Sequence, residues 1–264
     1  EILLAIPSLT NTRRREIINF LEPFPVLVRS LPGVSELAKG KVKVNDLLEI
    51  DLKDLLGRDP VEPNNELLHT NIRNKVVMVT GSGGSIGSEL CRQIVNLKPN
   101  KLVLYEISES ALYQIDQELK AINIFDIKIY PVIGSVTDRN RIIKKCKFYS
   151  VQTIYHAAAY KHVPLVEFNK SQGVFNNTIG TMQLAQAAID SNVETFVLIS
   201  TDKAVRPTNY MGASKRAAEM VLQALAKLSH DTCFTMVRFG NVLDSSGSVI
   251  PLFKKQIKEG GPVT

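Results

Sequence analysis

Three clusters of reactive side chains follow predicted strands in the second half of the sequence. Thr201-Asp202-Lys203 comes after the apolar run 193–200 and sets a carboxyl group beside an amine. Such a pair suits a reaction that removes one proton and delivers another at neighbouring atoms. The other clusters are Tyr160-Lys161-His162 and the segment 211–215, which opens a predicted helix. Because ligands of parallel sheets bind beyond the carboxyl ends of the strands, we expect one shared crevice.

Lys215 lies four residues after Met211, so the two side chains share one face of the predicted helix. A lysine there can donate a hydrogen bond to the ribose of a nicotinamide cofactor, and its charge lowers the pKa of neighbouring acids. Plainer interpretations are a surface lysine for Lys215, a loop salt bridge for Asp202 and Lys203, and an ordinary loop histidine for His162. The place of these residues after predicted strands favours function.

A cofactor site is predicted at residues 75–90, where an apolar strand runs into a glycine-rich turn and then a helix. Gly81 permits the sharp turn, Gly84 lets a pyrophosphate approach the backbone, and Gly87 lets the helix pack close to the strand. The first N–H groups of the helix and its positive dipole end then face the phosphates. The predicted cofactor-binding residues of the turn are Gly81, Ser82, Gly84, Ser85, Ile86 and Gly87.

Glu106 ends the next predicted strand, about 20 residues beyond the glycines, where a carboxylate that binds the adenosine ribose is expected. Its charge would repel a 2′-phosphate, so the sequence predicts NAD in preference to NADP. A solvated loop acid is the plainer interpretation of Glu106. Taken together, the glycines and this carboxylate predict dinucleotide binding.

Strands and helices alternate from residue 74 onward, which predicts an α/β fold, a doubly wound parallel sheet of the Rossmann type. Ala157, Ala158 and Ala159 follow the fourth predicted strand and let a cofactor lie flat across the strand tips. Asp138 is predicted to cap the following helix or to contact the adenine through the adjoining loop. The expected strands are 127–134, 153–156, 193–200 and 234–239, and the expected helices are 109–123, 139–147, 176–192 and 211–228.

Residues 1–55 are predicted to be the tail of another nucleotide-binding-like α/β domain, without a glycine fingerprint of its own. Its expected elements are strand 2–6, helix 12–21, strand 25–29 and a short amphipathic helix at 45–55. Residues 56–73 carry glycine, proline and asparagine among charges, which indicates a linker or surface arm. The NAD-binding domain is expected at 74–264. Both ends look cut, so we expect a piece of a longer protein.

The composition excludes several classes of protein. With 44% hydrophobic residues among 264, the chain can form a full core and is not a disordered protein. The net charge of +6 suits an anionic small molecule or acidic lipid, while no basic run is long enough to predict nucleic-acid binding. No apolar run reaches the roughly 18 residues of a membrane span. The cysteines are widely spaced and form no metal-binding pattern, so we predict reduced thiols and no metal.

Several motifs resemble those of the extended short-chain dehydrogenase/reductases, namely residues 80–87, Glu106, Asn177, 201–203 and 211–215. More narrowly, the sequence resembles the UDP-N-acetylglucosamine 4,6-dehydratases of capsule, O-antigen and protein-glycan biosynthesis. This likeness is carried by residues 156–164, 238–243 and 245–251, and it runs from about residue 50 to residue 264. Residues 1–50 resemble the end of the second nucleotide-binding-like domain of the long, membrane-anchored members.

The resemblance implies an NAD-dependent lyase that acts on UDP-N-acetylglucosamine. In this family a hydride passes from C4 to NAD, water is lost from C5 and C6, and the hydride returns to C6. The resemblance assigns Asp202 as the acid at C6 and Lys203 as the base at C5, with Thr201 and Lys215 in the same site. It places Val242 beside the cofactor, and the implied substrate-binding residues are Lys161, His162, Asn177, Asn241, Ser245 and Ser248.

Met211 departs from the wider family, in which most members carry a tyrosine here as acid/base at the sugar hydroxyl. A thioether cannot transfer a proton, but the sequence resembles long dehydratases that carry the same methionine. Tyr210 is one helical step, roughly 100°, away. The group that takes the C4 proton therefore stays open. Two alternatives remain: a UDP-sugar epimerase, which needs the tyrosine, and a non-catalytic nucleotide-binding scaffold, which would not need Asp202, Lys203 and Lys215 together.

The resemblance also implies amino-terminal transmembrane helices that this sequence lacks. We therefore expect membrane attachment only through those helices, at the cytoplasmic face of the inner membrane. The later uridine- and phosphate-binding segments of the family would lie beyond Thr264, so the substrate lobe is expected to be truncated. We expect a homo-oligomer, whose size the sequence does not give.

Overall fold

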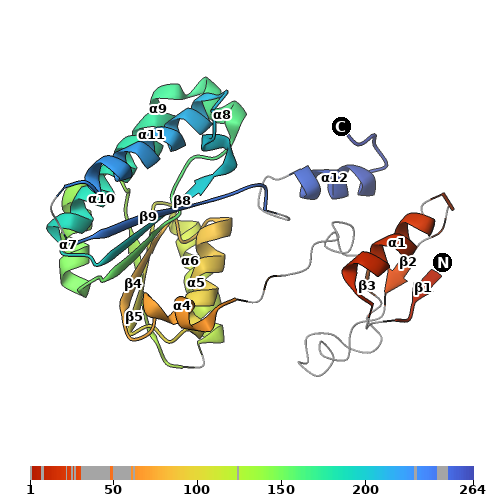
Figure 1. The fold of residues 1–264 in the computed structure, drawn as a ribbon, viewed down its shortest axis with the longest axis horizontal. Helices are drawn as coiled ribbons and strands as arrows, with labels where there is room; N and C mark the ends of the chain where they lie inside the picture. Colours follow the sequence, from red (N-terminus) through yellow and green to blue (C-terminus); the bar gives the residue numbers. More distant parts are fainter. Residues whose placement is uncertain are drawn as a thin grey trace. The chain divides into compact units, whose positions relative to one another are not determined.

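The computed structural model describes residues 2–6, 9–21, 23, 24, 26, 28–30, 48, 49, 61, 63–123, 125–228, 231–242 and 249–264. The chain divides into two units, Glu1–Pro63 and Asn64–Thr264. Each unit has its own sheet, shown in Figure 1. Within the described residues, no helix has both the length and the apolar character needed to cross a membrane.

The first unit contains β1 (Ile2–Leu4), α1 (Asn11–Leu21), β2 (Val28–Ser30) and β3 (Leu48–Glu49). β1 and β2 are parallel, as expected for a strand–helix–strand unit, whereas β3 pairs antiparallel with β2. The predicted helix at 45–55 is therefore wrong at Leu48 and Glu49, because these residues bond their backbone to β2. Amphipathic spacing does not reveal such a distant strand partner. The rest of 45–55 lies outside the described residues.

The second unit is built on a parallel sheet with strand order β6-β5-β4-β7-β8-β9, which confirms the predicted doubly wound fold. Each of its described strand pairs is parallel, so the carboxyl ends of all six strands lie at one edge. The strands are β4 (Val76–Thr80), β5 (Lys101–Glu106), β6 (Lys128–Ile133), β7 (Thr153–His156), β8 (Thr195–Thr201) and β9 (Cys233–Phe239).

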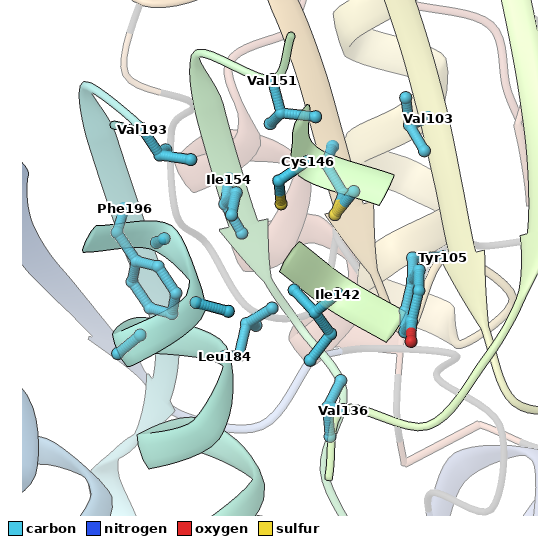
Figure 2. Packing of buried hydrophobic residues seen from close by; sticks show 14 of the residues in the cluster. Val103, Tyr105, Val136, Ile142, Cys146, Val151, Ile154, Leu184, Val193 and Phe196 are labelled. Atoms are coloured by element: carbon cyan, nitrogen blue, oxygen red, sulfur yellow. The ribbon is translucent and has the colours of Figure 1, made fainter. Parts of the chain in front are cut away.

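Helices cover both faces of this sheet, so alternate strand residues are buried on opposite sides. On one side Val76 and Met78 of β4 pack toward α7 (Arg139–Tyr149), α10 (Gly180–Asp190) and α11 (Tyr210–Leu225). Figure 2 shows this cluster, which includes Ile142 and Cys146 of α7 and Tyr105 of β5. On the other side Val77 and Val79 pack toward α5 (Ser85–Asn96) and α6 (Glu109–Ile122), which Figure 1 shows across the sheet from α10 and α11.

The predicted helix at 176–192 begins earlier and is interrupted. It is preceded by α8 (Val163–Phe168) and α9 (Lys170–Val174), and a π-helical turn at Phe175–Ile179 leads into α10. Asn177 in the π turn is fully buried and bonds to groups on two other segments, described below. Such long-range contacts have no signature in local hydrophobic spacing. The last helix is α12 (Val249–Lys258).

The predicted arm at 56–73 contains the short helix α4 (Asn65–Thr70), none of whose residues is buried. Asn64 caps it, because its Oδ1 accepts hydrogen bonds from the N–H groups of Glu66 and Leu67. Packing against the sheet begins just after this helix. Ile72 is buried beneath β4, and Thr153 Oγ1 donates a hydrogen bond to the carbonyl of Asn71. Residues 56–60 and 62 lie outside the described residues.

Candidate functional site

A cavity of about 1100 Å³ opens beyond the carboxyl ends of the parallel strands. It lies where ligands of doubly wound sheets bind. Segments that are far apart in the sequence supply its wall: residues 83–88, Ala157, 159–162, 199–201, Lys203, Met211, Lys215 and 239–242, with Gln114, Leu165, Val166, Asn169 and Gln172 at its side. The three reactive clusters predicted from the sequence therefore contribute to one cavity.

The glycine turn is shaped by close backbone approaches. Gly81 has φ of 68°, and a Cβ on it would lie 2.6 Å from the backbone of Ala158. A Cβ on Gly87 would lie 2.0 Å from the carbonyl oxygen of Gly81, so a side chain is excluded at both positions. Gly83, which the sequence analysis did not single out, would place a Cβ 2.5 Å from that of Ala111. A Cβ on Gly84 would meet only the Gly81 oxygen, at 3.4 Å, so its outer side is open to a ligand.

The residues of this turn fit a diphosphate. α5 begins at Ser85 with Gly84 at its N-cap, no side chain caps it, and its first turn lies on the cavity wall. The positive end of a helix dipole and its first N–H groups favour an anion there. Ser82 adds a buried hydroxyl that has no hydrogen-bond partner within the described structure. Ser82 and Gly81 themselves lie behind the wall, so they shape the turn from beneath.

Glu106 is buried at the end of β5, and the interpretation as a solvated acid is wrong. Its Oε2 accepts a hydrogen bond from the Gly83 N–H at 3.0 Å. Its Oε1 accepts from the N–H groups of Ile107 and Ser108, at 2.9 and 3.0 Å. A carboxylate offers about four acceptor sites, so three are already used. Glu106 therefore ties β5 to the glycine turn, and one acceptor site is left for a ribose hydroxyl, whereas a second ribose hydrogen bond would have to share or displace one of these bonds.

Asp138 is placed as a helix cap. It is exposed, and its Oδ1 accepts a hydrogen bond from the Arg141 N–H at 3.0 Å at the start of α7. It does not lie on the wall of the cavity. Ala157 and Ala159 do line the cavity, while Ala158 packs beneath Gly81. The structure thus favours the capping interpretation of Asp138 over the predicted adenine contact.

The acid–base pair begins where β8 ends, in a short 3₁₀ turn at Asp202–Ala204. Asp202 Oδ1 accepts a hydrogen bond from Thr201 Oγ1 at 2.9 Å and lies 3.4 Å from Lys203 Nζ. Lys203 Nζ also donates to Oδ1 of Asn241, at 3.1 Å. The hydrogen bond from Thr201, helped by the charge of Lys203, holds the pKa of the Asp202 carboxyl below its usual value. Asp202 is therefore an anion in the free protein, and it needs a proton before it can act as an acid.

Thr201, Lys203 and Asn241 line the cavity, whereas Asp202 stands at its edge with 56% of its side chain exposed. The pair does form a salt bridge, as the plainer interpretation holds. Its second contact sets it apart from a simple loop pair, because Asn241 lies beyond the end of β9. Val242 follows Asn241 on the cavity wall.

Lys215 is buried, so the interpretation as a surface lysine is wrong. Its Nζ donates a hydrogen bond to the carbonyl oxygen of Ile199 at 2.8 Å. Burial lowers the pKa of the Lys215 amine to about 8, and the carboxylate of Glu219 partly opposes this fall. Met211 is also buried, and both residues face the cavity from the same side of α11.

Asn177 is fully buried and does not line the cavity in this structure, so its predicted place beside the sugar stays a prediction. It bonds to the backbone of Tyr160 in both directions, accepting from the N–H at 2.8 Å and donating to the carbonyl at 3.0 Å. It also donates to Ser214 Oγ at 3.0 Å. With every polar atom used inside the protein, Asn177 positions the loop after β7 against α11. Lys161 and His162 of that loop are exposed on the cavity wall.

His156 is a buried residue that the sequence analysis did not assign. It is the register partner of Thr80, whose Oγ1 lies 2.7 Å from His156 Nδ1. His156 Nε2 lies 2.9 Å from Thr181 Oγ1, which itself donates to the carbonyl of Asn177. Burial, and next the charge of Lys215, lower the pKa of His156 to about 3, so the ring is neutral. The sequence did offer a signal for this contact, because a polar residue ends each of two adjacent strands, Thr80 in β4 and His156 in β7. Predicted Ser245 and Ser248 lie outside the described residues.

Residues 77–264 match the family described as polysaccharide biosynthesis protein. The chain belongs to this family. It is 46% identical over 264 residues to the capsular polysaccharide biosynthesis protein CapD of Staphylococcus aureus, which covers 100% of this chain and 44% of CapD. The resemblance predicted from the motifs is confirmed at the level of family.

Two further relatives of this chain have names that state an enzymatic activity. A UDP-N-acetylglucosamine 4,6-dehydratase (inverting) of Campylobacter jejuni is 33% identical over 196 residues, which cover 72% of this chain and 57% of that enzyme. A UDP-glucose 4-epimerase of Rickettsia rickettsii is 36% identical over 198 residues, covering 72% and 56%. The chain thus spans about half the length of these curated relatives.

Two solved structures have a fold similar to that of this chain. Pen from Bacillus thuringiensis matches with a TM-score of 0.67 and 34% identity, covering 72% of this chain and 59% of Pen. DesIV, a dTDP-glucose 4,6-dehydratase from Streptomyces venezuelae solved with NAD bound, matches with a TM-score of 0.62 and covers 71% and 63%. Its identity is 22%, so this second match speaks for the fold alone.

Proposed function

We propose that the protein dehydrates UDP-N-acetylglucosamine to a UDP-4-keto-6-deoxy-N-acetylhexosamine with NAD, in the synthesis of a capsular or related polysaccharide. The observation that carries this proposal is the contact of Lys203 with both Asp202 and Asn241 at the wall of the cavity. A base beside an acid is what loss of water from neighbouring carbons needs. The relation to a named dehydratase supports the same reaction.

The described residues fit NAD. The open side of Gly84 and the uncapped start of α5 suit its diphosphate. Glu106 lies at the end of β5, where an acidic residue would select against a 2′-phosphate. Lys215 would hold the nicotinamide ribose from the cavity wall. When bound, NAD supplies an acceptor for the hydride from C4 and a donor of that hydride to C6.

Thr201 and Asp202 offer a route for the C4 proton that does not need a tyrosine at position 211. In the free protein Thr201 Oγ1 donates to Asp202 Oδ1, and Thr201 lies on the cavity wall. The C4 hydroxyl would pass its proton to Thr201 while Thr201 passes its own to Asp202. The carboxylate then becomes a neutral acid. Its new proton leaves with the C6 hydroxyl as water, so the C4 proton is fully accounted for.

Protonation of Asp202 also prepares Lys203. In the proposed step the Lys203 amine, no longer facing an anion, gives one proton to solvent while Asn241 holds it in place. Neutral Lys203 takes the proton from C5, which the C4 ketone has acidified. When the hydride returns to C6, Lys203 gives the proton back to C5. Asp202 is then a carboxylate once more, and the salt bridge reforms when the neutral Lys203 amine regains a proton from solvent.

The test is incubation of the full-length protein with UDP-N-acetylglucosamine and NAD, with the product followed by the alkaline absorbance of the 4-keto-6-deoxy sugar and by NMR. Formation of that product, lost in Asp202→Asn, supports the proposal. A C4 epimer as sole product would instead establish an epimerase, which the relation to the Rickettsia enzyme favours and Met211 opposes. Absence of any conversion, with NAD bound, would identify a scaffold.

A further inference from the structure

Glu219 is a buried carboxylate on α11 that the proposed chemistry does not use. Its side chain has 0% of its surface exposed, and it lies one helical turn after Lys215. Oε1 accepts hydrogen bonds from Ser200 Oγ at 2.6 Å and from Arg238 Nε at 2.7 Å. Oε2 accepts from a second nitrogen of Arg238 and from Arg216 Nη1 at 3.0 Å. All four acceptor directions of the carboxylate are therefore filled.

These contacts join three elements at the edge of the cavity. Ser200 of β8 and Arg238 of β9 are register partners, and Glu219 bonds to both. One turn earlier on α11, Lys215 holds the carbonyl of Ile199, so the helix contacts two successive residues of β8. β8 and β9 then lead directly into Asp202–Ala204 and into Asn241. The network thus sits just before the residues that meet at Lys203.

Glu219 also supplies a fixed negative charge near the Lys215 amine. Burial by itself raises the pKa of Glu219, but the hydrogen bonds from Arg238, Ser200 and Arg216 outweigh it and bring the pKa to about 2. Glu219 is thus an anion throughout the range in which Lys215 titrates, and its charge raises the pKa of the Lys215 amine against the effect of burial.

The other titratable groups near Lys215 do not stabilise the positive charge of its amine. His156 on β7 is held neutral, so it neither repels nor offsets the charge of the amine. Arg216 and Arg238 are directed to Glu219. On the cavity side, Tyr160, Lys161, His162 and Lys203 share the wall with Lys215. In the described structure, Glu219 is the carboxylate whose charge acts on this amine.

We propose that Glu219 is a positioning residue that holds β8 and β9 in register with α11 at the cavity and keeps the Lys215 amine protonated. A purely structural link would not need a buried charge, because apolar residues of similar volume stabilise a core at lower cost. The i, i+4 spacing to Lys215 gives the charge a target. What Lys215 binds rests on the proposed function, but its protonation does not.

The experiment is an NMR titration of the lysine side-chain nitrogens in the full chain, with the Lys215 signal assigned from Lys215→Arg. Glu219→Gln keeps the shape of the side chain and removes its charge. We expect the Lys215 titration to move to lower pH by roughly one unit or more. Glu219→Asp, which retains the charge, should restore most of the shift. Arg216→Gln is the matched control, because it removes a donor to Glu219 but leaves the Arg238 pair and the wild-type titration.

A folded Glu219→Gln variant in which Lys215 titrates as in the wild type would overturn the proposal. If this variant does not fold, Glu219→Gln with Arg238→Met removes the buried carboxylate together with its Arg238 partner and leaves only the partly exposed Arg216 without its carboxylate. The same downward shift is expected, and its absence in that folded double variant overturns the proposal equally. The titration needs no substrate, so a failed dehydratase assay leaves it standing. In an active enzyme, the alkaline limb of kcat/KM should move with the NMR titration.

Discussion

Lys203 Nζ donates a hydrogen bond to Oδ1 of Asn241, a residue 38 positions later in the sequence, at 3.1 Å. This bond joins the turn after β8 to the segment after β9 and fixes the amine at the cavity wall. Asn241→Ala should free the Lys203 side chain and lower kcat by roughly 10-fold, since misplacement of a general base weakens proton transfer. Steady-state kinetics will test this. An unchanged kcat would show that Asn241 does not position the base.

The paired variants Asp202→Asn and Lys203→Met should separate chemistry from cofactor binding. Each should lower turnover by roughly 10²-fold or more, the scale of general acid–base groups. Exchange of the C5 proton with solvent deuterium should fall most in Lys203→Met, because that step needs the base and not the C6 acid. NAD affinity, measured by calorimetry, should change little. Asp190→Asn breaks a surface pair with Arg139 and serves as the control. Near wild-type turnover in both variants would exclude the assignment.

We expect the Met211 side chain to fill space at the site and not to take part in proton transfer. Met211→Leu conserves the volume of this buried side chain, so we expect activity close to that of the wild type. Met211→Tyr introduces a larger ring at a site with 3% exposure and should reduce activity rather than increase it. The comparison of the two variants in the dehydratase assay decides the point. A gain of activity in Met211→Tyr would mean that the missing tyrosine limits the reaction.

Glu106 and Asp138 should behave differently toward the cofactor. Glu106→Gln replaces an acceptor oxygen with a donor in a site that faces three backbone N–H groups, so the glycine turn should be disturbed. NAD should bind at least about 10-fold more weakly, the factor that corresponds to about 1.4 kcal/mol. Asp138→Ala removes a helix cap and should leave NAD affinity unchanged while lowering the melting temperature. Weaker NAD binding by Asp138→Ala would instead support the predicted contact of Asp138 with the adenine.

His156 should make stability depend on acid pH. The pKa of His156 is about 3 in the folded protein, compared with an ordinary value of 6.5. Between these two pH values the unfolded chain binds a proton at His156 that the folded protein does not bind. The stability that neutral His156 gives is complete above pH 6.5 and is lost as the pH falls toward 3. The slope for one proton is about 1.4 kcal/mol per pH unit. The melting temperature of the wild type should therefore fall more steeply with decreasing pH in this window than that of His156→Gln. Parallel curves of melting temperature against pH would contradict the prediction.

The sequence by itself determined the elements whose residues carry their own signal. β7 at Thr153–His156 has the predicted bounds, because its β-branched and aromatic residues favour a strand and three small residues follow it. The cap of α7 by Asp138 was predicted for the same reason, since an acceptor side chain bonds N–H groups only a few residues away. The glycine turn was readable because φ and close approach restrict positions such as Gly81 and Gly87 to one residue type.

The tertiary structure alone decided which polar residues face the cavity and which lie behind it. Motif likeness placed Asn177 beside the substrate, but its amide is consumed by Tyr160 and Ser214 from other segments. Glu219 carries no local mark of its burial, because Ser200 and Arg238 reach it only when β8, β9 and α11 have packed. Hydrogen bonds between distant segments depend on the packed geometry of the sheet and helices. A pattern of neighbouring residue types cannot encode them.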